Sequence, residues 1–245
     1  MKISFVIPCM NSGTVIKNSI KKLNKELSKI KKLNYELIII DDGSTDKTGQ
    51  IIKSLKKKNI NIITNLVNLG KSSSLIKSIK LAKYKKIIIW DCDLPYFRYI
   101  HKLIKLLNNN DFVYINRKSK KSKLVSTNLN FYQICRFLIS KIVCRTINLL
   151  LMKKYMGDTQ AGLKAFNKPK NFNKIKFISK KFFFDAELMI LFDRAGAKIV
   201  SIPLRYKIYK NSTIKIFGFE NFLYLFELIK VILFYKVKKI KKISF

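Results

Sequence analysis

The sequence is poor in acidic residues and in histidine. It has 14 aspartates and glutamates against 51 lysines and arginines, and its formal net charge is +37. His101 is the single histidine. That excludes zinc sites built from several histidines and leaves one residue for any histidine-dependent triad. With so few acids, the places where carboxylates gather become informative.

Neither disulfide bonds nor a secretion signal are expected. The four cysteines contain no C-x-x-C pair, so no disulfide framework is expected: Cys9, Cys92, Cys135 and Cys144. They are interpreted as reduced thiols of a cytosolic protein. Met1 and Lys2 lead into a short apolar stretch, residues 3–8, that is too short for a signal core. We therefore expect a cytoplasmic protein.

The excess of positive charge favours anionic partners, namely nucleic acid, acidic lipid or phosphorylated substrates. The lysines, however, are dispersed along the chain among Ile and Asn, a pattern that AT-rich coding bias also produces. Nucleic-acid binding typically needs clustered basic and aromatic residues on one element. A basic nucleic-acid-binding protein is thus a remote alternative, and no nucleic-acid partner is expected.

Hydrophobic patterning predicts an α/β fold with a mainly parallel sheet flanked by helices. Apolar runs at residues 3–8, 36–41, 60–64 and 87–90 predict buried strands, with helices between them at 14–31, up to 58, and 71–82. Such alternation with short loops is typical of parallel sheets. Further strands are predicted at 111–115, 163–166 and 198–203, and helices at 128–152 and 182–194.

Two of the predicted strands end in acid. Asp41 and Asp42 close the strand 36–41, and Asp91 and Asp93 follow the run 87–90. Parallel strands present their carboxyl ends at one edge, where ligands bind. Asp91 and Asp93 point to the same side if the extended backbone continues, and two close carboxylates suit a hard divalent cation. Solvated acidic turns are the alternative, and the shared edge makes it the weaker one.

The second half offers less specific polar signals. Arg136 and Ser140 are four residues apart and so share one helix face, where they could hold a phosphate. On spacing alone, an ordinary surface pair is the better interpretation. Asp185, near the start of the helix 182–194, is interpreted as a complement to the helix dipole.

The C-terminal segment, residues 214–245, is set apart from a domain of residues 1–213. Its run 216–235 has about the 20 apolar residues that span a bilayer. Glu220, Glu227 and Lys230 interrupt that run, and a basic tail follows it. The preferred interpretation is an interfacial amphipathic helix on an anionic membrane surface. A helix packed on the domain ranks second and a true span third.

Six motifs, in order and spacing, carry a resemblance to a known family. The chain resembles the family 2 glycosyltransferases with the GT-A (Rossmann-like) fold, and within them the polyprenyl- and dolichyl-phosphate sugar transferases, over residues 3–210. The final motif is most similar to the dolichyl-phosphate glucosyltransferase branch. The motifs are residues 6–11 (VIPCMN), 41–46 (DDGSTD), 68–71 (NLGK), 91–94 (DCDL), Arg136 with Ser140, and 158–166 (DTQAGLKAF).

The resemblance implies roles on the donor side. Pro8 and Asn11 would line the nucleotide pocket, and Asp42, with Asp41 before it, would contact the base or ribose. Lys71 would lie by the nucleotide. The Asp-x-Asp motif, Asp91 and Asp93, would hold Mg²⁺ or Mn²⁺ on the diphosphate of a nucleotide-sugar donor.

The resemblance also implies roles on the acceptor side. Arg117, Arg136 and Ser140 match positions that bind an acceptor phosphate, and Arg205 matches a basic position that meets phosphate from a late loop. Asp158 and Gln160 would lie near the reacting centre; with Asp93 and Arg136 they form the implied catalytic set.

Three positions depart from the family pattern. Ser12 stands where the family usually has Glu, Cys92 replaces Ala, and Pro95 replaces a Gln that often helps at the metal. Pro95 bears on the metal coordination that the resemblance implies and Ser12 on the nucleotide contacts, and both aspartates of the motif stay in place.

The expected activity is an inverting, metal-dependent sugar transfer to a polyprenyl or dolichyl phosphate at the cytoplasmic face of a membrane. A phosphate acceptor is already anionic at neutral pH, so it needs cations rather than a strong base. The alternative is a family 2 enzyme that acts on a sugar hydroxyl in surface polysaccharide synthesis. That enzyme would need a base, for which Asp158 is the candidate.

Overall fold

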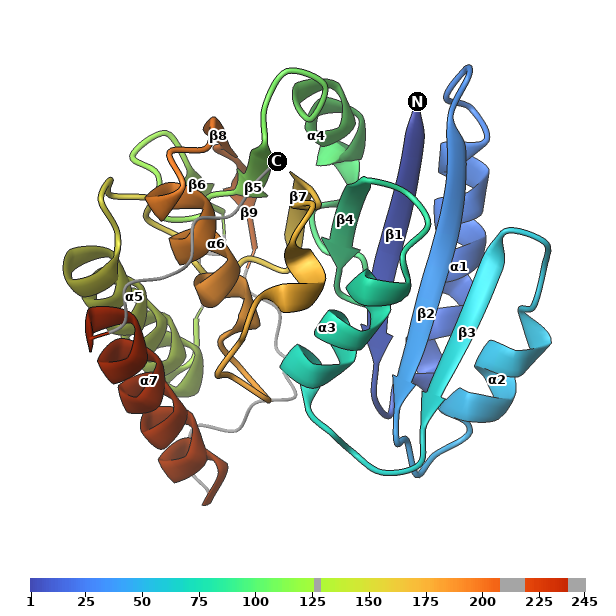
Figure 1. Cartoon of the computed structure of the whole chain (residues 1–245). Helices are drawn as coiled ribbons and strands as arrows, with labels where there is room; N and C mark the ends of the chain where they lie inside the picture. Colours follow the sequence, from blue (N-terminus) through green and yellow to red (C-terminus); the bar gives the residue numbers. More distant parts are fainter. Residues whose placement is uncertain (126–128, 208–218, 238–245) are drawn as a thin grey trace.

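A computed structural model describes residues 1–125, 129–207 and 219–237. Its centre is a seven-stranded sheet in the order β3-β2-β1-β4-β7-β5-β8, with helices on both faces (Figure 1). A separate two-stranded sheet pairs β6 with β9. The strands are β1 (Lys2–Cys9), β2 (Asn34–Asp42), β3 (Ile60–Asn65), β4 (Lys86–Trp90), β5 (Phe112–Ile115), β6 (Lys123–Leu124), β7 (Leu163–Asn167), β8 (Ile199–Ile202) and β9 (Arg205–Tyr206).

Helices fill the connections, as the alternating pattern predicts. The α-helices are α1 (Gly13–Leu27), α2 (Thr48–Ser54), α3 (Lys71–Leu81), α4 (Ile100–Leu106), α5 (Phe131–Leu151), α6 (Phe184–Arg194) and α7 (Phe219–Val237). The α/β class with a mainly parallel sheet, flanked by helices and followed by a C-terminal helix, is confirmed.

The sheet separates two hydrophobic cores because successive strand side chains point to opposite faces. In β4, Ile87 and Ile89 enter the core under α3, α5, α6 and α7. Ile88 and Trp90 enter the core under α1, α2 and α4. This burial on both faces explains why β4 is a continuous apolar run rather than an alternating one.

One strand runs against the others. β7 lies between β4 and β5 and is antiparallel to both, whereas β1 is parallel to β2 and to β4. Leu163 at the start of β7 therefore lies opposite Trp90 at the end of β4. The carbonyl of Gly162 also accepts a hydrogen bond from the Asp91 N–H at 3.0 Å. In this way the antiparallel strand brings the loop 157–162 to the carboxyl end of β4.

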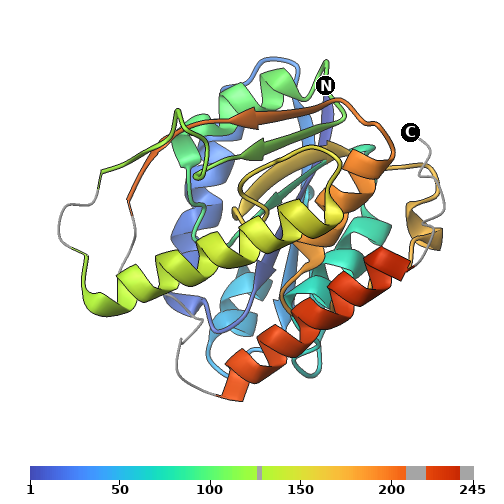
Figure 2. The same cartoon turned by 90° about the vertical axis from the view of Figure 1, so that its left-hand side faces the viewer.

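Helices α5 and α7 lie side by side on the outside of the molecule (Figures 1 and 2). Helix α7 buries Leu228, Val231 and Tyr235 against the domain. Both helices also leave large apolar side chains exposed: Phe131, Ile134, Leu138, Ile142 and Leu149 on α5, and Phe222, Leu225, Phe226, Ile229 and Leu233 on α7. Within the described ranges, no helix combines the length and apolarity that a membrane crossing requires.

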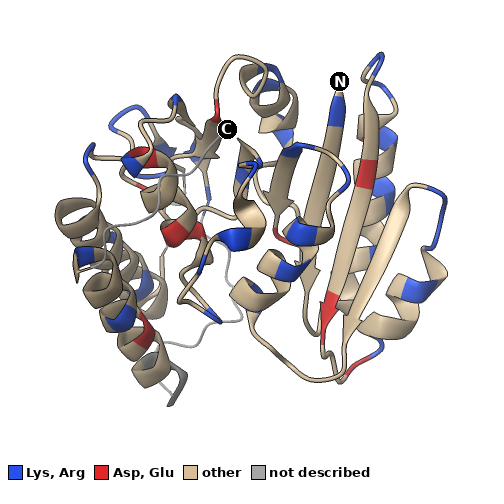
Figure 3. Cartoon of the chain, viewed as in Figure 1, with Lys and Arg blue, Asp and Glu red and all other residues tan. Residues whose placement is uncertain are grey.

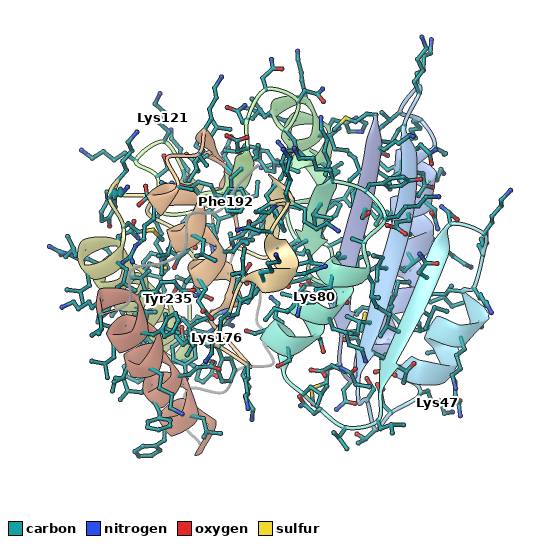
Figure 4. All side chains as sticks on the ribbon, in the orientation of Figure 1. Lys47, Lys80, Lys121, Lys176, Phe192 and Tyr235 are labelled. Carbon is teal, nitrogen blue, oxygen red and sulfur yellow. The ribbon has the colours of Figure 1, made fainter. Side chains whose placement is uncertain are left out.

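Two carboxylates fasten α7 to α6 and to the loop that precedes it. Glu227 accepts hydrogen bonds from three consecutive backbone N–H groups, those of residues 180, 181 and 182, at 2.6–2.9 Å. Tyr235, labelled in Figure 4 where α7 meets the domain, donates to the buried Glu187 at 2.8 Å. The carbonyl of Lys180 in turn accepts from the N–H of Ser73 in the first turn of α3. The segment predicted as an interfacial helix thus packs one face on the domain and exposes another. The remainder of the predicted C-terminal segment, residues 214–218 and 238–245, lies outside the described residues.

Candidate active site

The two acidic strand ends lie at one edge of the sheet. β1 is hydrogen-bonded in parallel to β2 on one side and to β4 on the other. Asp41 and Asp42 are the last residues of β2, and Asp91 directly follows β4. The carboxylates therefore come from neighbouring positions along the carboxyl edge, as the sequence predicts for parallel strands.

Asn11 joins the loops that follow β1 and β2. Its backbone has a left-handed conformation, with φ of 46°. The Asn11 N–H donates to the Ser44 hydroxyl, and the Asn11 side-chain carbonyl accepts from the Thr45 N–H, both at 2.9 Å. Pro8 lies near the end of β1 and pairs with Ile40 of β2. Pro8 and Asn11 thus lie beside the acidic end of β2.

Asp41 and Asp42 are buried and bonded to their own neighbourhood. Asp41 accepts from the N–H of Ser44 at 3.1 Å. One oxygen of Asp42 accepts from the Asn65 side chain at 2.9 Å and from the N–H of Leu69 at 3.0 Å. Both aspartates therefore shape the loops of this edge, and Asp42 fixes the turn that leads into α3. Sequence reasoning assigned them to ligand contact and did not predict this supporting role.

Lys71, the first residue of α3, reaches across to the end of β4. Its Nζ lies 2.6 Å from Asp91 Oδ1 and 3.9 Å from Asp185 Oδ2. Burial alone would lower the pKa of Lys71, but the charges of Asp91 and Asp185 raise it above its ordinary value. Lys71 is therefore charged at neutral pH and adds a cation to the carboxylate edge.

Asp93 is exposed, and within the described ranges no other side chain is hydrogen-bonded to its carboxylate. Partial burial of the carboxyl and the negative charge of Asp91 raise the pKa of Asp93. A raised carboxyl pKa beside another aspartate marks negative charge that is incompletely compensated. A cation bound here would compensate that charge.

The donor set fits a hard divalent ion. Carboxylate oxygens are the ligands that Mg²⁺ and Mn²⁺ prefer. No cluster of three or more His, Cys, Asp or Glu side chains with metal-binding geometry occurs in the part of the chain that the structure describes. The metal that the resemblance implies would be held by Asp91 and Asp93.

Pro95 has no side-chain metal ligand, and its backbone contributes to the turn that follows Asp93. Its carbonyl accepts a hydrogen bond from the Trp90 indole at 2.8 Å. The residues on either side, Leu94 and Tyr96, have left-handed backbone conformations with φ of 49° and 62°. Non-glycine residues in that region are uncommon and cluster at functional sites. The chain therefore turns sharply just after Asp93.

Arg117 and Asp158 form a buried ion pair. The Arg117 guanidinium donates hydrogen bonds to both oxygens of Asp158, from Nε to Oδ2 and from Nη2 to Oδ1 at 2.9 Å. The backbone N–H of Arg117 also donates to Oδ2, at 3.2 Å. Asp158 has no exposed surface. Burial would raise the pKa of Asp158, yet the charge and hydrogen bonds of Arg117 lower it to about 2. Asp158 is therefore a carboxylate at neutral pH.

Gln160 lies next to this pair. Its backbone N–H donates to Asp158 Oδ1 at 3.1 Å. Its side-chain Nε2 is buried, and among the described residues it has no hydrogen-bond partner. A buried donor without a partner is costly, so this amide is free to donate to a ligand. The predicted pair Asp158 and Gln160 is thus brought together.

Two further cations, Lys118 and Arg136, lie beside the ion pair. Together with Arg117 they are called the cationic cluster below. Lys118 Nζ donates to the Ser140 hydroxyl at 3.0 Å. Arg136 is partly buried and forms no ion pair within the described ranges. Burial and the positive charge of Arg117 lower the pKa of Arg136. A cation under repulsion from another cation fits an anionic ligand.

The spacing argument for Arg136 and Ser140 favoured an ordinary surface pair, whereas the structure joins Ser140 to Lys118 of this cluster. Lys118 was missed because it begins a basic loop. Its position directly after Arg117, at the end of β5, was the available signal. Arg205 lies in β9, where its backbone is hydrogen-bonded to Arg98 and Tyr99 and its side chain is exposed.

Comparison with known proteins places this geometry in context. Residues 4–194 match the family model described as glycosyl transferase family 2. The chain is 25% identical to a dolichyl-phosphate beta-glucosyltransferase of Trichomonas vaginalis, over 96% of this chain and 74% of that protein. It is 28% identical to a dolichol-phosphate mannosyltransferase of Pyrococcus furiosus, over 92% of this chain and 62% of that protein.

A solved structure shares the fold. Glucosyl-3-phosphoglycerate synthase from Mycobacterium tuberculosis, crystallised with Mn²⁺, UDP-glucose and phosphoglyceric acid, superposes with a TM-score of 0.66 and 18% identity. The superposition covers 96% of this chain and 79% of that one. The two chains therefore share a fold.

Proposed function

The chain belongs to glycosyl transferase family 2, and on that basis we propose that it transfers a sugar from a nucleotide-diphosphate sugar to a polyprenyl or dolichyl phosphate, with inversion at the anomeric carbon. Donors similar to UDP-glucose or GDP-mannose are proposed. Relatives that include a dolichyl-phosphate beta-glucosyltransferase and a dolichol-phosphate mannosyltransferase support a lipid-phosphate acceptor.

The ion pair of Asp158 with Arg117 is the observation that favours a phosphate acceptor over a sugar hydroxyl. A sugar hydroxyl acceptor needs a general base whose pKa lies near the working pH. Asp158 has a pKa of about 2, and both its oxygens are engaged by Arg117. Such a carboxylate is a weak base, so the hydroxyl-acceptor alternative loses its candidate residue.

A phosphate acceptor fits the same geometry without a base. It is an anion at neutral pH and needs cations that hold it against the donor. The cationic cluster offers Arg136 without a carboxylate partner in the described ranges, and Lys118 on the Ser140 hydroxyl. The unpartnered amide of Gln160 would donate to the sugar or the phosphate. We therefore assign Arg136, Lys118 and Ser140 to the acceptor phosphate.

On the donor side, Asp91 and Asp93 would hold Mg²⁺ or Mn²⁺. When bound, that ion would neutralise the charge that develops on the leaving diphosphate. The protein contributes a fixed frame. Asn11 ties together the loops after β1 and β2, and Asp42 fixes the turn before Lys71. Gly162, against which Asp91 packs, leaves no room for a side chain, since a Cβ there would lie 1.9 Å from Asp91 Oδ2.

We also propose that the protein works on the cytoplasmic face of a membrane. Exposed apolar side chains on the neighbouring helices α5 and α7 suit an interfacial position. The net charge of +37 suits an anionic lipid surface. Helix α5 also carries Arg136 and Ser140, so the acceptor site and the proposed lipid contact share one helix.

Binding to nucleic acid has no comparable support. Lysine and arginine are spread over the whole molecule rather than gathered on one element (Figure 3). The labelled lysines, Lys47, Lys80, Lys121 and Lys176, illustrate this spread (Figure 4). A dispersed positive surface gives weak, salt-sensitive attraction without a binding element.

The direct test is release of nucleotide diphosphate from a panel of UDP- and GDP-sugars with Mg²⁺ or Mn²⁺, with and without undecaprenyl or dolichyl phosphate. We expect release that depends on the lipid phosphate and is lost in Asp93→Ala. Release that responds only to sugar acceptors would instead establish the hydroxyl-acceptor alternative. Absence of release with every pair would contradict the proposed activity.

A further inference from the structure

Lys164 is a lysine with no exposed surface, in the middle of the sheet. It belongs to β7 and has a relative exposure of 0%. Its Nζ donates to the carbonyl of Ala161 at 2.5 Å and lies 2.9 Å from Asp185 Oδ1. A buried ammonium is costly unless it is paired and hydrogen-bonded, and Lys164 meets both conditions.

Asp185 is the partner that makes this burial possible. It lies in the first turn of α6 and is 5% exposed. Its two oxygens are directed to different lysines, with Oδ1 2.9 Å from Lys164 Nζ and Oδ2 3.9 Å from Lys71 Nζ. The helix dipole favours a carboxylate at this position. The contacts, however, show a buried residue between two cations rather than a solvated helix cap.

The four side chains form a row of alternating charge: Lys164, Asp185, Lys71 and Asp91. Within that row, the Lys71 ammonium lies between the carboxylates of Asp91 and Asp185. It is hydrogen-bonded to Asp91 at 2.6 Å, and the nearest oxygen of Asp185 is 3.9 Å away. Asp185 therefore stands close enough to accept the ammonium after a small side-chain movement.

This arrangement has a consequence for a divalent ion at the same edge. An ammonium bonded to Asp91 Oδ1 occupies a lone pair that a metal would use, and the two cations repel each other. Metal binding therefore becomes easier if Lys71 can leave Asp91 for another carboxylate. Asp185 is held ready for that by Lys164, which also fixes the carbonyl of Ala161 in the loop 158–162.

We propose that Asp185 is a positioning residue: it takes up the Lys71 ammonium when a divalent cation binds Asp91, and Lys164 holds it in place for this exchange. The inference rests on the proposed function, which assigns the cation to Asp91 and Asp93. It adds that Lys71 is a resident counter-ion that competes with the metal until Asp185 receives it.

The test is binding of Mn²⁺ alone to the full chain, without turnover, measured from the free-ion signal in electron paramagnetic resonance. In Asp185→Asn, Lys71 loses its second carboxylate, and we expect the dissociation constant for Mn²⁺ to rise about fivefold to tenfold, the range of a close charge coupling. In Lys71→Met, no ammonium competes, and the constant should fall. In Lys71→Met with Asp185→Asn, the effect of Asp185→Asn should vanish.

Two further variants separate this role from a role in folding. Lys164→Met with Asp185→Asn removes both buried charges together and should raise the constant as Asp185→Asn does. Asp193→Asn changes a buried aspartate at the other end of α6, where it accepts from the Lys153 N–H, and should leave the constant unchanged. Circular dichroism of each variant confirms that its fold is retained.

Each outcome decides a different point. An unchanged constant in Asp185→Asn, with normal binding by the wild type, would overturn the inference alone. So would an equal rise in the Lys71→Met background, because Asp185 would then act without Lys71. Absence of Mn²⁺ binding by the wild type would overturn the proposed metal site and the inference with it.

Discussion

Arg117 binds Asp158 through its guanidinium and through its own backbone N–H. The residues are 41 positions apart in sequence, and the pair joins the end of β5 to the loop before β7. The Asp158 carboxylate has no contact with solvent, so protein groups must balance its negative charge. Arg117 makes the largest contribution to that balance. The acceptor side of the site therefore depends on this pair for its stability.

Replacing Arg117 should destabilise the fold strongly. Arg117→Met leaves a buried carboxylate without its partner, and breaking such a pair costs about 3–5 kcal/mol. Urea denaturation at pH 7 measures the loss. Arg117→Met combined with Asp158→Asn should recover part of it, because no uncompensated charge remains. A single variant as stable as the wild type would show that the pair contributes nothing.

The same pair predicts how stability depends on pH. The pKa of Asp158 is about 2 in the folded protein, below its ordinary value of 3.8. A depressed pKa contributes stability that is present above pH 4 and is lost as the pH falls from about 4 to about 2. The contribution is about 2 kcal/mol. The difference in unfolding free energy between wild type and Asp158→Asn should shrink over this window; a constant difference would contradict the assignment.

Turnover should not require Asp158 as a base. If the acceptor is a lipid phosphate, the titration of Asp158 should not affect kcat between pH 5 and 8, because Asp158 is fully ionised there. The shape of the pH–rate profile in this range should therefore be the same in wild type and Asp158→Asn. The measurement is a pH–rate profile for both proteins with saturating donor and lipid phosphate. An acidic limb in that range that Asp158→Asn removes would support the hydroxyl-acceptor mechanism instead.

Arg136 should act on the acceptor. Arg136→Ala removes a cation without an ion-pair partner in the described ranges, and we expect the KM for lipid phosphate to rise about tenfold or more, as for loss of a charge-assisted hydrogen bond. The KM for the nucleotide sugar should change little. Arg145→Ala is the matched control, an exposed arginine on the same helix. Equal effects of both variants would indicate a general loss of positive charge.

The apolar surface of α5 and α7 should bind lipid. Ile142→Asp with Leu233→Asp places a charge on each helix, where the side chains are 65% and 58% exposed. Co-sedimentation with anionic vesicles should fall, while unfolding free energy should stay within about 1 kcal/mol. Leu81→Asp, at a 63% exposed leucine at the end of α3, is the control. Equal sedimentation of all three proteins would argue against this surface.

The sequence was most informative where the chemistry is local. A buried strand that ends in carboxylates is visible along a single stretch, so the edge formed by Asp41, Asp42 and Asp91 could be predicted. The order of the parallel strands brings those ends together without further information. The same holds for Asp158 and Gln160, which are two residues apart and share a loop.

The contacts that depend on distant strands could not be predicted. A lysine at position 164 reads as one of many exposed lysines, and its burial follows only from the insertion of β7 between β4 and β5. Without that burial, Asp185 is indistinguishable from an ordinary acidic residue at a helix start. Glu227 likewise reads as an interruption of an apolar run, because its partners are backbone groups of a loop 45 to 47 residues earlier.

The hydrogen bonds that Glu227 accepts from residues 180–182 also limit how this protein can be shortened. A truncation before α7 would leave three adjacent N–H groups ahead of α6 without their acceptor. The carbonyl of Lys180, which accepts a hydrogen bond from the first turn of α3, would then belong to a loop held by its remaining contacts with Glu187 and Ser72. Because Lys71 begins that helix, the minimal unit that preserves the donor side includes the last described helix of the chain.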